Sequence, residues 1–190
     1  DGINTYTYVG NNPTNAIDPY GLYTLIIHGW GTHEAGYSGG IGNTLRSYGE
    51  TVKEFTWSGF AGEKGILGKV KNEIIQASKI AKSRGEKLNI IGHSWGGVLA
   101  GSALRSTGIR VDNFVTMGTP YFNFTRPPEV IGYANFIAEA DPIALLSKLN
   151  FTAKHFNITD RGESSHDIHT GYWNNPEVIR TIMEMFDFNG

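Results

Sequence analysis

The stretch Ile91-Gly92-His93-Ser94-Trp95-Gly96-Gly97 carries the strongest structural signal of this sequence. It ends an apolar run over 87–91 and precedes a run of helical character over 98–104. A strand, a tight turn and a helix in this order place a serine at the tip of the turn. Because Gly92 and Gly96 carry no Cβ, the strand and the helix can approach closely while the Ser94 hydroxyl projects outward. The stretch therefore predicts a nucleophile elbow with Ser94 as the nucleophile.

A second match to Gly-x-Ser-x-Gly occurs at Gly36-Tyr37-Ser38-Gly39-Gly40. The residues before it, 31–35, have no strand character, and the chain holds 25 glycines, so the pattern alone has little specificity. We interpret Ser38 as part of a glycine-rich loop.

The composition bounds the class of protein. The 190 residues are enough for one domain with a full core, and 39% apolar and 12% aromatic residues are typical of a globular chain. A net charge of −2 with scattered lysines and arginines argues against a nucleic-acid binder. The absence of cysteine excludes disulfides and thiolate metal sites. No secretory leader opens the sequence, so we expect an export address to lie on a larger carrier.

Apolar runs alternate with segments of helical periodicity from Tyr23 onward. Strands are expected at 23–28, 52–57, 88–91, 111–117, 133–138 and 154–158, and helices at 43–48, 63–84, 95–106, 142–149 and 176–186. The segments 29–40, 118–128 and 160–174 are expected to be loops, with Asn175 capping the last helix. This alternation predicts an α/β fold with a mostly parallel, doubly wound sheet of about six strands and flanking helices.

A serine nucleophile needs a general base, and the base needs an acid that orients it. On a doubly wound hydrolase sheet these follow the serine in the order acid, then histidine. Asp141 comes just after the predicted strand 133–138, at the edge where reactive groups collect. Asp160, after the strand 154–158, is the main alternative, whereas Asp112 opens its strand and falls at the opposite edge.

The base is expected in the segment Ser165-His166-Asp167-Ile168-His169. We favour His169, which precedes Thr-Gly-Tyr-Trp and the closing helix, and keep His166 as the alternative. His155 lies inside a predicted strand and is expected to be packed or at an edge.

An oxyanion hole would complete this site. One donor is expected to be the N–H of Trp95, the residue after the nucleophile. The other is expected to be the N–H of Trp30, in the glycine-bearing turn His28-Gly29-Trp30-Gly31 that follows the first strand. No metal-ligand or phosphate-binding motif accompanies these residues, so we expect neither a metal nor another cofactor.

Residues 23–190 resemble an α/β-hydrolase of the lipase and esterase kind. The resemblance is carried by His-Gly-Trp-Gly at 28–31, Gly-His-Ser-Trp-Gly at 92–96, Met-Gly-Thr-Pro at 117–120, Ala-Asp-Pro-Ile at 140–143, and His169 with Tyr172-Trp173. Trp57-Ser58-Gly59 is similar to a short motif in lipase-like domains of bacterial toxins. The resemblance of residues 23–190 implies a minimal α/β-hydrolase fold, since about 168 residues leave no room for a large cap domain.

Residues 1–22 resemble the end of the Rhs repeat-associated core. The motifs are Asn4-x-Tyr6-x-Tyr8-Val9-x-Asn11-Asn12-Pro13 and Ile17-Asp18-Pro19-Tyr20-Gly21-Leu22. In that family this signature separates an encapsulating shell from a variable C-terminal toxin. The shell cleaves itself by an aspartyl mechanism, which here implies a cut between Leu22 and Tyr23 with Asp18 as one acid. Asp18, Pro19, Gly21 and Leu22 would then form the self-cleavage motif.

Together the resemblances imply a polymorphic toxin with a lipase payload. Such payloads resemble phospholipases that bacterial secretion systems, often type VI, deliver into competing cells. The family implies a cognate immunity protein, the Rhs shell as a partner, and contact with a lipid or membrane surface. Two alternatives stay open: another acyl-transfer enzyme of this fold (an esterase, thioesterase or amidase), or a catalytically inactive hydrolase fold that serves as a binding module.

Overall fold

The computed structural model describes residues 21–30, 36–58, 64–120, 127, 129–138, 141, 154–158 and 165–187. The expected helix 142–149 and most of the expected loop 118–128 lie outside these ranges, as do residues 1–20 of the Rhs-like segment.

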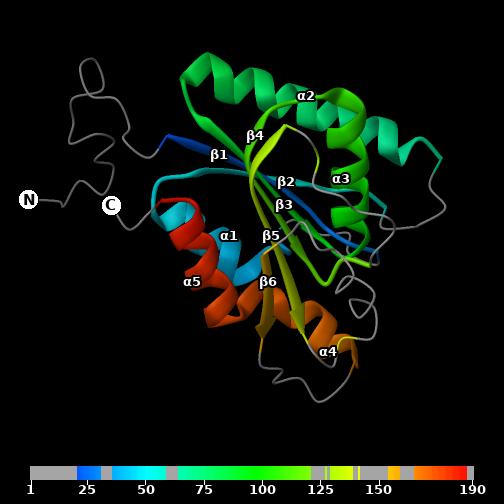
Figure 1. Cartoon of the computed structure of the whole chain (residues 1–190), viewed down its shortest axis with the longest axis vertical. Helices are drawn as coiled ribbons and strands as arrows, with labels where there is room; N and C mark the ends of the chain where they lie inside the picture. The colour runs from blue at the N-terminus through cyan, green and yellow to red at the C-terminus, as the bar shows by residue number, and fades with distance from the viewer. Residues whose placement is uncertain are drawn as a thin grey trace, which may run out of the picture.

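One parallel sheet of six strands forms the centre of the molecule, in the order β2-β1-β3-β4-β5-β6 (Figure 1). The strands are β1 (Leu22–Ile27), β2 (Thr51–Phe55), β3 (Lys87–His93), β4 (Val111–Met117), β5 (Val130–Ala138) and β6 (Lys154–Ile158). Parallel strands all run the same way, so their carboxyl ends meet at one edge. The sequence-based prediction of an α/β fold with about six mostly parallel strands is confirmed.

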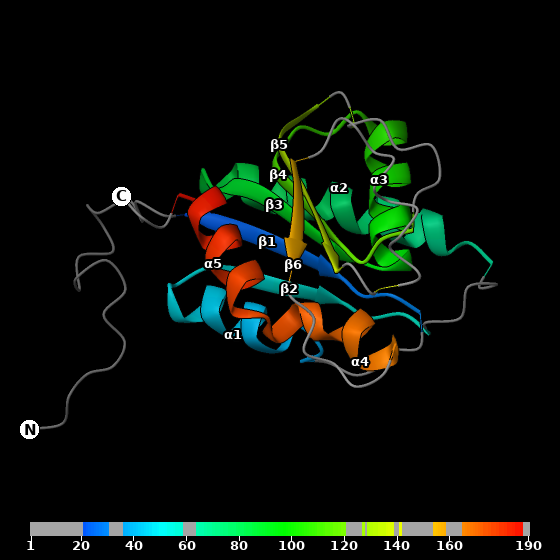
Figure 2. The ribbon, with the colours of Figure 1, turned by 60° about the horizontal axis from the view of Figure 1, so that its bottom comes forward.

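Helices cover both faces of this sheet (Figures 1 and 2). One face packs against α2 (Ile66–Arg84) and α3 (Trp95–Thr107), and the other against α1 (Gly39–Ser47) and α5 (Pro176–Met185). Near α5 lie the short helix α4 (Ser165–Thr170) and the 3₁₀ turn η3 (Gly171–Asn174). Alternate side chains of β1 enter the two cores: Leu22 and Ile26 face α1 and α5, whereas Leu25 and Ile27 face α2 and α3.

The final helix begins where the sequence predicts it. The Asn175 side chain accepts hydrogen bonds from the N–H groups of Glu177 at 2.9 Å and Val178 at 3.2 Å, and Pro176 is the first helical residue. A capping asparagine followed by proline satisfies the first amides of the helix and fixes its start.

Three elements begin three or four residues away from the predicted position, and the other described boundaries differ by at most two residues. The helix α2 begins at Ile66 rather than at residue 63, because Gly65 adopts a left-handed φ of 78°. The strand β5 begins at Val130 rather than at Tyr133, because Gly132 leaves space for the Asn113 side chain of β4. The helix α1 begins at Gly39, four residues earlier than expected at 43, directly after the turn at Ser38.

The expectation of a loop over 160–174 is wrong for its second half, which forms α4 and η3. Ile168 and Tyr172, four residues apart, pack on the α1/α5 core together with Trp173. This apolar spacing holds a helical segment in place despite the polar composition around it. Among the described residues, no helix has the length and apolar character needed to cross a bilayer.

Candidate active site

Ser94 lies at the tip of the turn between β3 and α3, in a strained backbone conformation. Its φ of 51° and ψ of −127° fall in a region that residues with a Cβ rarely adopt. The turn is tight on both sides: a Cβ at Gly92 would lie 2.5 Å from the Gly97 Cα, and one at Gly96 would lie 2.3 Å from the Ile27 carbonyl oxygen. These glycines therefore allow β1, β3 and α3 to close around the serine.

The turn after β1 lies against Ser94. A Cβ at Gly29 would lie 2.6 Å from the Ser94 Cβ and 3.1 Å from its Oγ, so only glycine permits this approach. Ser94 is 7% exposed, and its own N–H donates to the Met117 carbonyl at 2.9 Å. The loops after β1, β3 and β4 thus meet at the serine.

His28 fixes the orientation of this turn. Its Nδ1 lies 2.6 Å from the Gly29 carbonyl oxygen and its Nε2 lies 3.2 Å from the Trp57 backbone nitrogen. Since a carbonyl oxygen only accepts and a backbone N–H only donates, Nδ1 carries the proton and Nε2 accepts. The Trp57 indole N–H donates to the His28 carbonyl at 3.2 Å, and the two rings stack at 5.3 Å.

The same hydrogen bond constrains the amide of Trp30. The Gly29 carbonyl and the Trp30 N–H belong to one peptide group, and a trans peptide points them in opposite directions. Because the carbonyl points to the His28 ring, the Trp30 N–H points away from that ring. The Trp30 indole is 66% exposed. Trp95 is the first residue of α3, where amide groups point outward from the helix N-terminus.

Asp141 and His169 form a buried pair. His169 Nδ1 lies 2.8 Å from Asp141 Oδ2, and the two residues are 8% and 0% exposed. Asp141 sits just past the end of β5, where its N–H donates to the Ala138 carbonyl at 3.1 Å. His169 lies near the end of α4. A carboxylate bound to Nδ1 leaves the opposite ring nitrogen, Nε2, to act on a substrate or nucleophile.

Tyr172 completes this pair from the side of the acid. Its hydroxyl donates to Asp141 Oδ2 at 2.9 Å and accepts from the Ala138 N–H at 2.8 Å. The ring is fully buried. Sequence reasoning used Tyr172 only as part of a family resemblance and gave it no role.

His93 joins the pair to the serine turn. It directly precedes Ser94, its ring centroid lies 4.8 Å from that of His169, and its Nε2 lies 2.6 Å from the His169 carbonyl oxygen. That oxygen accepts, so Nε2 donates. Burial, and then the charge of His169, lower the pKa of His93 to about 3, and it therefore stays neutral near pH 7. In the sequence, the signal that could have pointed to His93 was its place directly before the serine, at the end of an apolar strand.

Gly118 leaves the space in which these groups meet. It follows β4 with a φ of 54°. A Cβ there would lie 2.8 Å from Tyr172 Cε2, 3.0 Å from Asp141 Oδ2 and 3.1 Å from His169 Cε1. Gly118, in the Gly-Thr-Pro step after β4, therefore has a steric role at this edge of the sheet.

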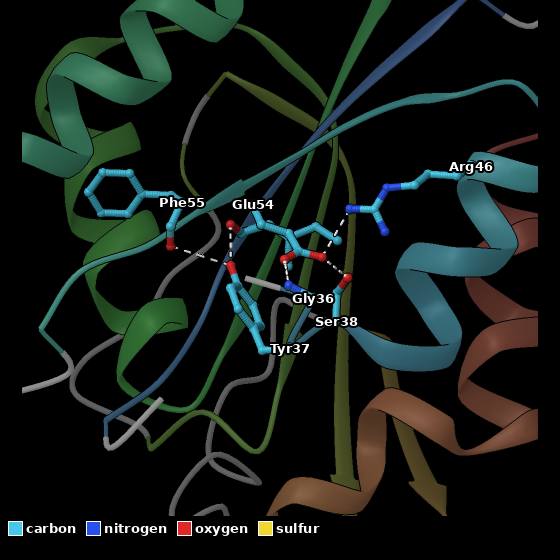
Figure 3. Close-up of polar contacts among 7 residues, drawn as sticks. Gly36, Tyr37, Ser38, Arg46, Glu54 and Phe55 are labelled. Atoms are coloured by element: carbon cyan, nitrogen blue, oxygen red, sulfur yellow. Dashed lines mark hydrogen bonds and ion pairs between the residues drawn. The ribbon is translucent and has the colours of Figure 1, made fainter. Parts of the chain in front are cut away.

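Ser38 lies in a different set of contacts, around the edge strand β2 (Figure 3). Its hydroxyl donates to Glu54, which also accepts from the Gly36 N–H at 2.5 Å and from Arg46 at 3.0 Å. Burial raises the pKa of Glu54, but these donors outweigh it and hold that pKa below its ordinary value. The Tyr37 hydroxyl donates to the Ile26 carbonyl at 2.7 Å. These bonds fix the start of α1 against β2 and occupy the Ser38 hydroxyl.

The structure thus brings together the favoured acid and base, beside the turn that carries Ser94. The alternative acid Asp160 and the motif residues Asp18 and Pro19 lie outside the described residues, as does the side chain of the alternative base His166. Gly21 and Leu22 are described: the Gly21 carbonyl accepts from the Lys87 N–H at 2.9 Å, and Leu22 opens β1. Within the described ranges, no three histidine or carboxylate side chains gather as they would around a metal ion.

A family model described as "Alpha/beta hydrolase" matches residues 69–142, a segment that contains both Ser94 and Asp141. Two curated relatives are triacylglycerol lipases, from Pseudarthrobacter phenanthrenivorans and Burkholderia plantarii, each 28% identical over 129 residues. The matched region covers 65% of this chain and only 39% and 35% of those lipases. The chain therefore spans well under half of the length of these relatives.

Solved structures show the same fold. The ydeN gene product of B. subtilis superposes with a TM-score of 0.65 at 11% identity, over 87% of this chain and 98% of that one. A serine hydrolase without a lid from Xanthomonas campestris gives a TM-score of 0.57 at 13% identity, over 91% of this chain and 83% of that one. The predicted α/β-hydrolase fold without a large cap is thus confirmed for the part of the chain that the structure describes.

Proposed function

We propose that this chain is a serine ester hydrolase that acts on lipids, with Ser94 as nucleophile, His169 as general base and Asp141 as the orienting acid. The observation that carries the proposal is the strained Ser94 turn beside a buried Asp141–His169 pair. Backbone strain at a serine between a strand and a helix persists only where the surroundings impose it, and such strain clusters at active sites. The lipase-like relatives support the same reaction class.

The reaction has two halves. Ser94 Oγ attacks the ester carbonyl carbon while His169 Nε2 takes the hydroxyl proton, and the resulting oxyanion accepts hydrogen bonds from the N–H groups of Trp30 and Trp95. The carbon–oxygen bond to the leaving alcohol then breaks, and His169 returns its proton to that alcohol. In the second half His169 deprotonates a water that attacks the acyl carbon. The bond from that carbon to Ser94 Oγ then breaks, His169 returns the proton to Oγ, and the acid leaves. Asp141 holds the imidazole in the required tautomer throughout.

The exposed Trp30 supports a lipid substrate. Its indole lies on the turn that touches Ser94 and is 66% exposed, although large exposed hydrophobic side chains are few among the described residues. An indole has an apolar body and a polar N–H, which suits the boundary between acyl chains and water. We therefore assign Trp30 a second role as a contact with the lipid surface.

The target and the delivery of the enzyme rest on residues 1–22. The resemblance of this segment to the end of an Rhs core supports a phospholipase effector that is released from its shell after Leu22 and injected into a target cell. A cognate immunity protein would protect the producing cell. On this proposal Asp18, Pro19, Gly21 and Leu22 form the cleavage motif.

The test is fatty-acid release by the full chain from phospholipid vesicles, a triglyceride emulsion and short nitrophenyl esters, with wild type beside Ser94→Ala. We expect fatty-acid release from phospholipid by the wild type and none by Ser94→Ala. Relative to the wild type, Trp30→Ala should lose more of its rate on vesicles than on soluble esters. Activity retained by Ser94→Ala would discard the mechanism. Hydrolysis of the nitrophenyl esters or the triglyceride without phospholipid would keep the serine hydrolase and reject phospholipid as the substrate. No hydrolysis and no reaction with a fluorophosphonate probe would favour a binding module.

A further inference from the structure

We infer that Tyr172 is a positioning residue for the reaction, acting through Asp141 rather than on the substrate. The inference rests on the proposed function, since it assigns Asp141 the role of the acid. It concerns a hydroxyl that bonds both to the acid and to the backbone at the end of β5.

The two hydrogen bonds of Tyr172 fix the direction of its proton. The Ala138 N–H donates to the hydroxyl oxygen at 2.8 Å, so that nitrogen cannot receive the hydroxyl proton. The proton therefore points to Asp141 Oδ2, 2.9 Å away. The acceptor is a carboxylate, which makes this a charge-assisted hydrogen bond of the stronger kind.

The same carboxylate oxygen receives the base. Asp141 Oδ2 lies 2.8 Å from His169 Nδ1 and 2.9 Å from the Tyr172 hydroxyl, so two donors hold one oxygen from two directions. The Asp141 side chain can turn about two dihedral angles, and a donor on each side of Oδ2 restricts that rotation more than the imidazole does alone. The Tyr172 hydroxyl thus helps to keep Oδ2 where it orients the imidazole.

The surroundings hold the Tyr172 ring and keep it from the substrate. The side chain is fully buried and belongs to the α1/α5 core, and its Cε2 would lie 2.8 Å from a Cβ at Gly118. The His93 ring centroid lies 6.0 Å from that of Tyr172. A fixed and buried ring cannot adjust to a ligand, so its hydroxyl acts on the rate of the chemical step and not on substrate binding.

The variant Tyr172→Phe removes only the hydroxyl and keeps the packed ring. We expect kcat, and the rate at which a fluorophosphonate probe labels Ser94, to fall roughly 10- to 100-fold, the range set by losing a hydrogen bond to a charged group. KM should stay within about twofold, because ground-state binding is untouched. Tyr23→Phe is the matched control: Tyr23 is also buried, at 3% exposure, but lies on β1 in the other core and should leave the rate unchanged.

A double-mutant cycle identifies the route of the effect. If Tyr172 acts through Asp141, the loss caused by Tyr172→Phe should disappear in an Asp141→Asn background, where the charged acceptor is gone. An equal loss in both backgrounds overturns the inference, as does a wild-type labelling rate in Tyr172→Phe.

Proton NMR of the wild-type chain gives a readout that needs neither turnover nor a folded variant. The structure predicts a strongly deshielded resonance from the proton between His169 Nδ1 and Asp141, with a nuclear Overhauser effect to the Tyr172 hydroxyl proton bound to the same oxygen. Their absence overturns the inference. If both are present while the wild type neither labels nor hydrolyses any ester, the proposed function fails and the hold of Tyr172 on Asp141 stands.

Discussion

Gly118→Ala should disrupt the Asp141–His169 pair without replacing any functional side chain. The new methyl group meets two penalties. A φ of 54° costs a residue with a Cβ about 1–2 kcal/mol. The Cβ would also lie 2.8 Å from Tyr172 Cε2 and 3.0 Å from Asp141 Oδ2, and relieving such overpacking costs about 1–3 kcal/mol. The expected loss in the free energy of unfolding is therefore about 2–5 kcal/mol.

The crowding also reaches the chemistry. His169 Cε1 would lie 3.1 Å from the new Cβ, so the imidazole and the carboxylate must shift relative to each other. A displacement of about 1 Å in a catalytic group can cost about 100-fold in rate. We expect this loss in the rate of fluorophosphonate labelling of Ser94, measured in buffer where the variant is folded.

Gly108→Ala is the matched control for the backbone penalty. Gly108 has a similar φ of 62° at the end of α3, but no atom lies within 4 Å of its virtual Cβ. It should lose only about 1–2 kcal/mol in urea unfolding and keep its labelling rate. If Gly118→Ala and Gly108→Ala behave alike in both assays, the steric reasoning is wrong.

Three further predictions concern buried groups. Glu50 accepts from Thr24 at 2.7 Å, and burial raises its pKa from 4.5 to about 7, so the free energy of unfolding should fall as the pH rises from 4.5 through 7. In urea titrations Glu50→Gln should remove this decline, which is worth about 3 kcal/mol above pH 7. Burial lowers the pKa of His93 from 6.5 to about 3, so the free energy of unfolding should fall as the pH drops from 6.5 toward 3. In thermal melts His93→Gln, which keeps a donor, should reduce this dependence on pH. His28→Ala should lower kcat by roughly 100-fold or more with KM little changed, because the Gly29 carbonyl loses its hydrogen-bond donor and the Trp30 N–H loses its orientation. An unchanged kcat would show that the turn after β1 has no part in catalysis.

Much of the fold could be predicted because its signals are local. The buried strands β1, β3 and β4 are apolar runs bounded by glycine, and α5 has a capping asparagine followed by proline. Parallel topology follows from strands that alternate with helices. The Ser94 turn could be predicted for the same reason, since its glycines lie within a few residues of the serine.

The rest depends on contacts between distant segments. The helix α4 and the turn η3 are stabilised by packing of Ile168 and Tyr172 into the core, which no local pattern encodes strongly. The bond from Tyr172 to Asp141 joins residues 31 positions apart, and that from His93 to His169 joins residues 76 apart. The order acid then histidine led to Asp141 and His169, but their contacts with Tyr172 and His93 became visible only in the folded chain.

Covalent labelling can show whether Ser94 is a nucleophile activated by His169 and Asp141. The most direct test is to react the full chain with a fluorophosphonate probe and locate the adduct by peptide mass mapping, with His169→Ala alongside. We expect an adduct on Ser94, none on Ser38, and a large loss of labelling in His169→Ala. An adduct on another serine, or labelling of Ser94 that does not depend on His169, would contradict this expectation.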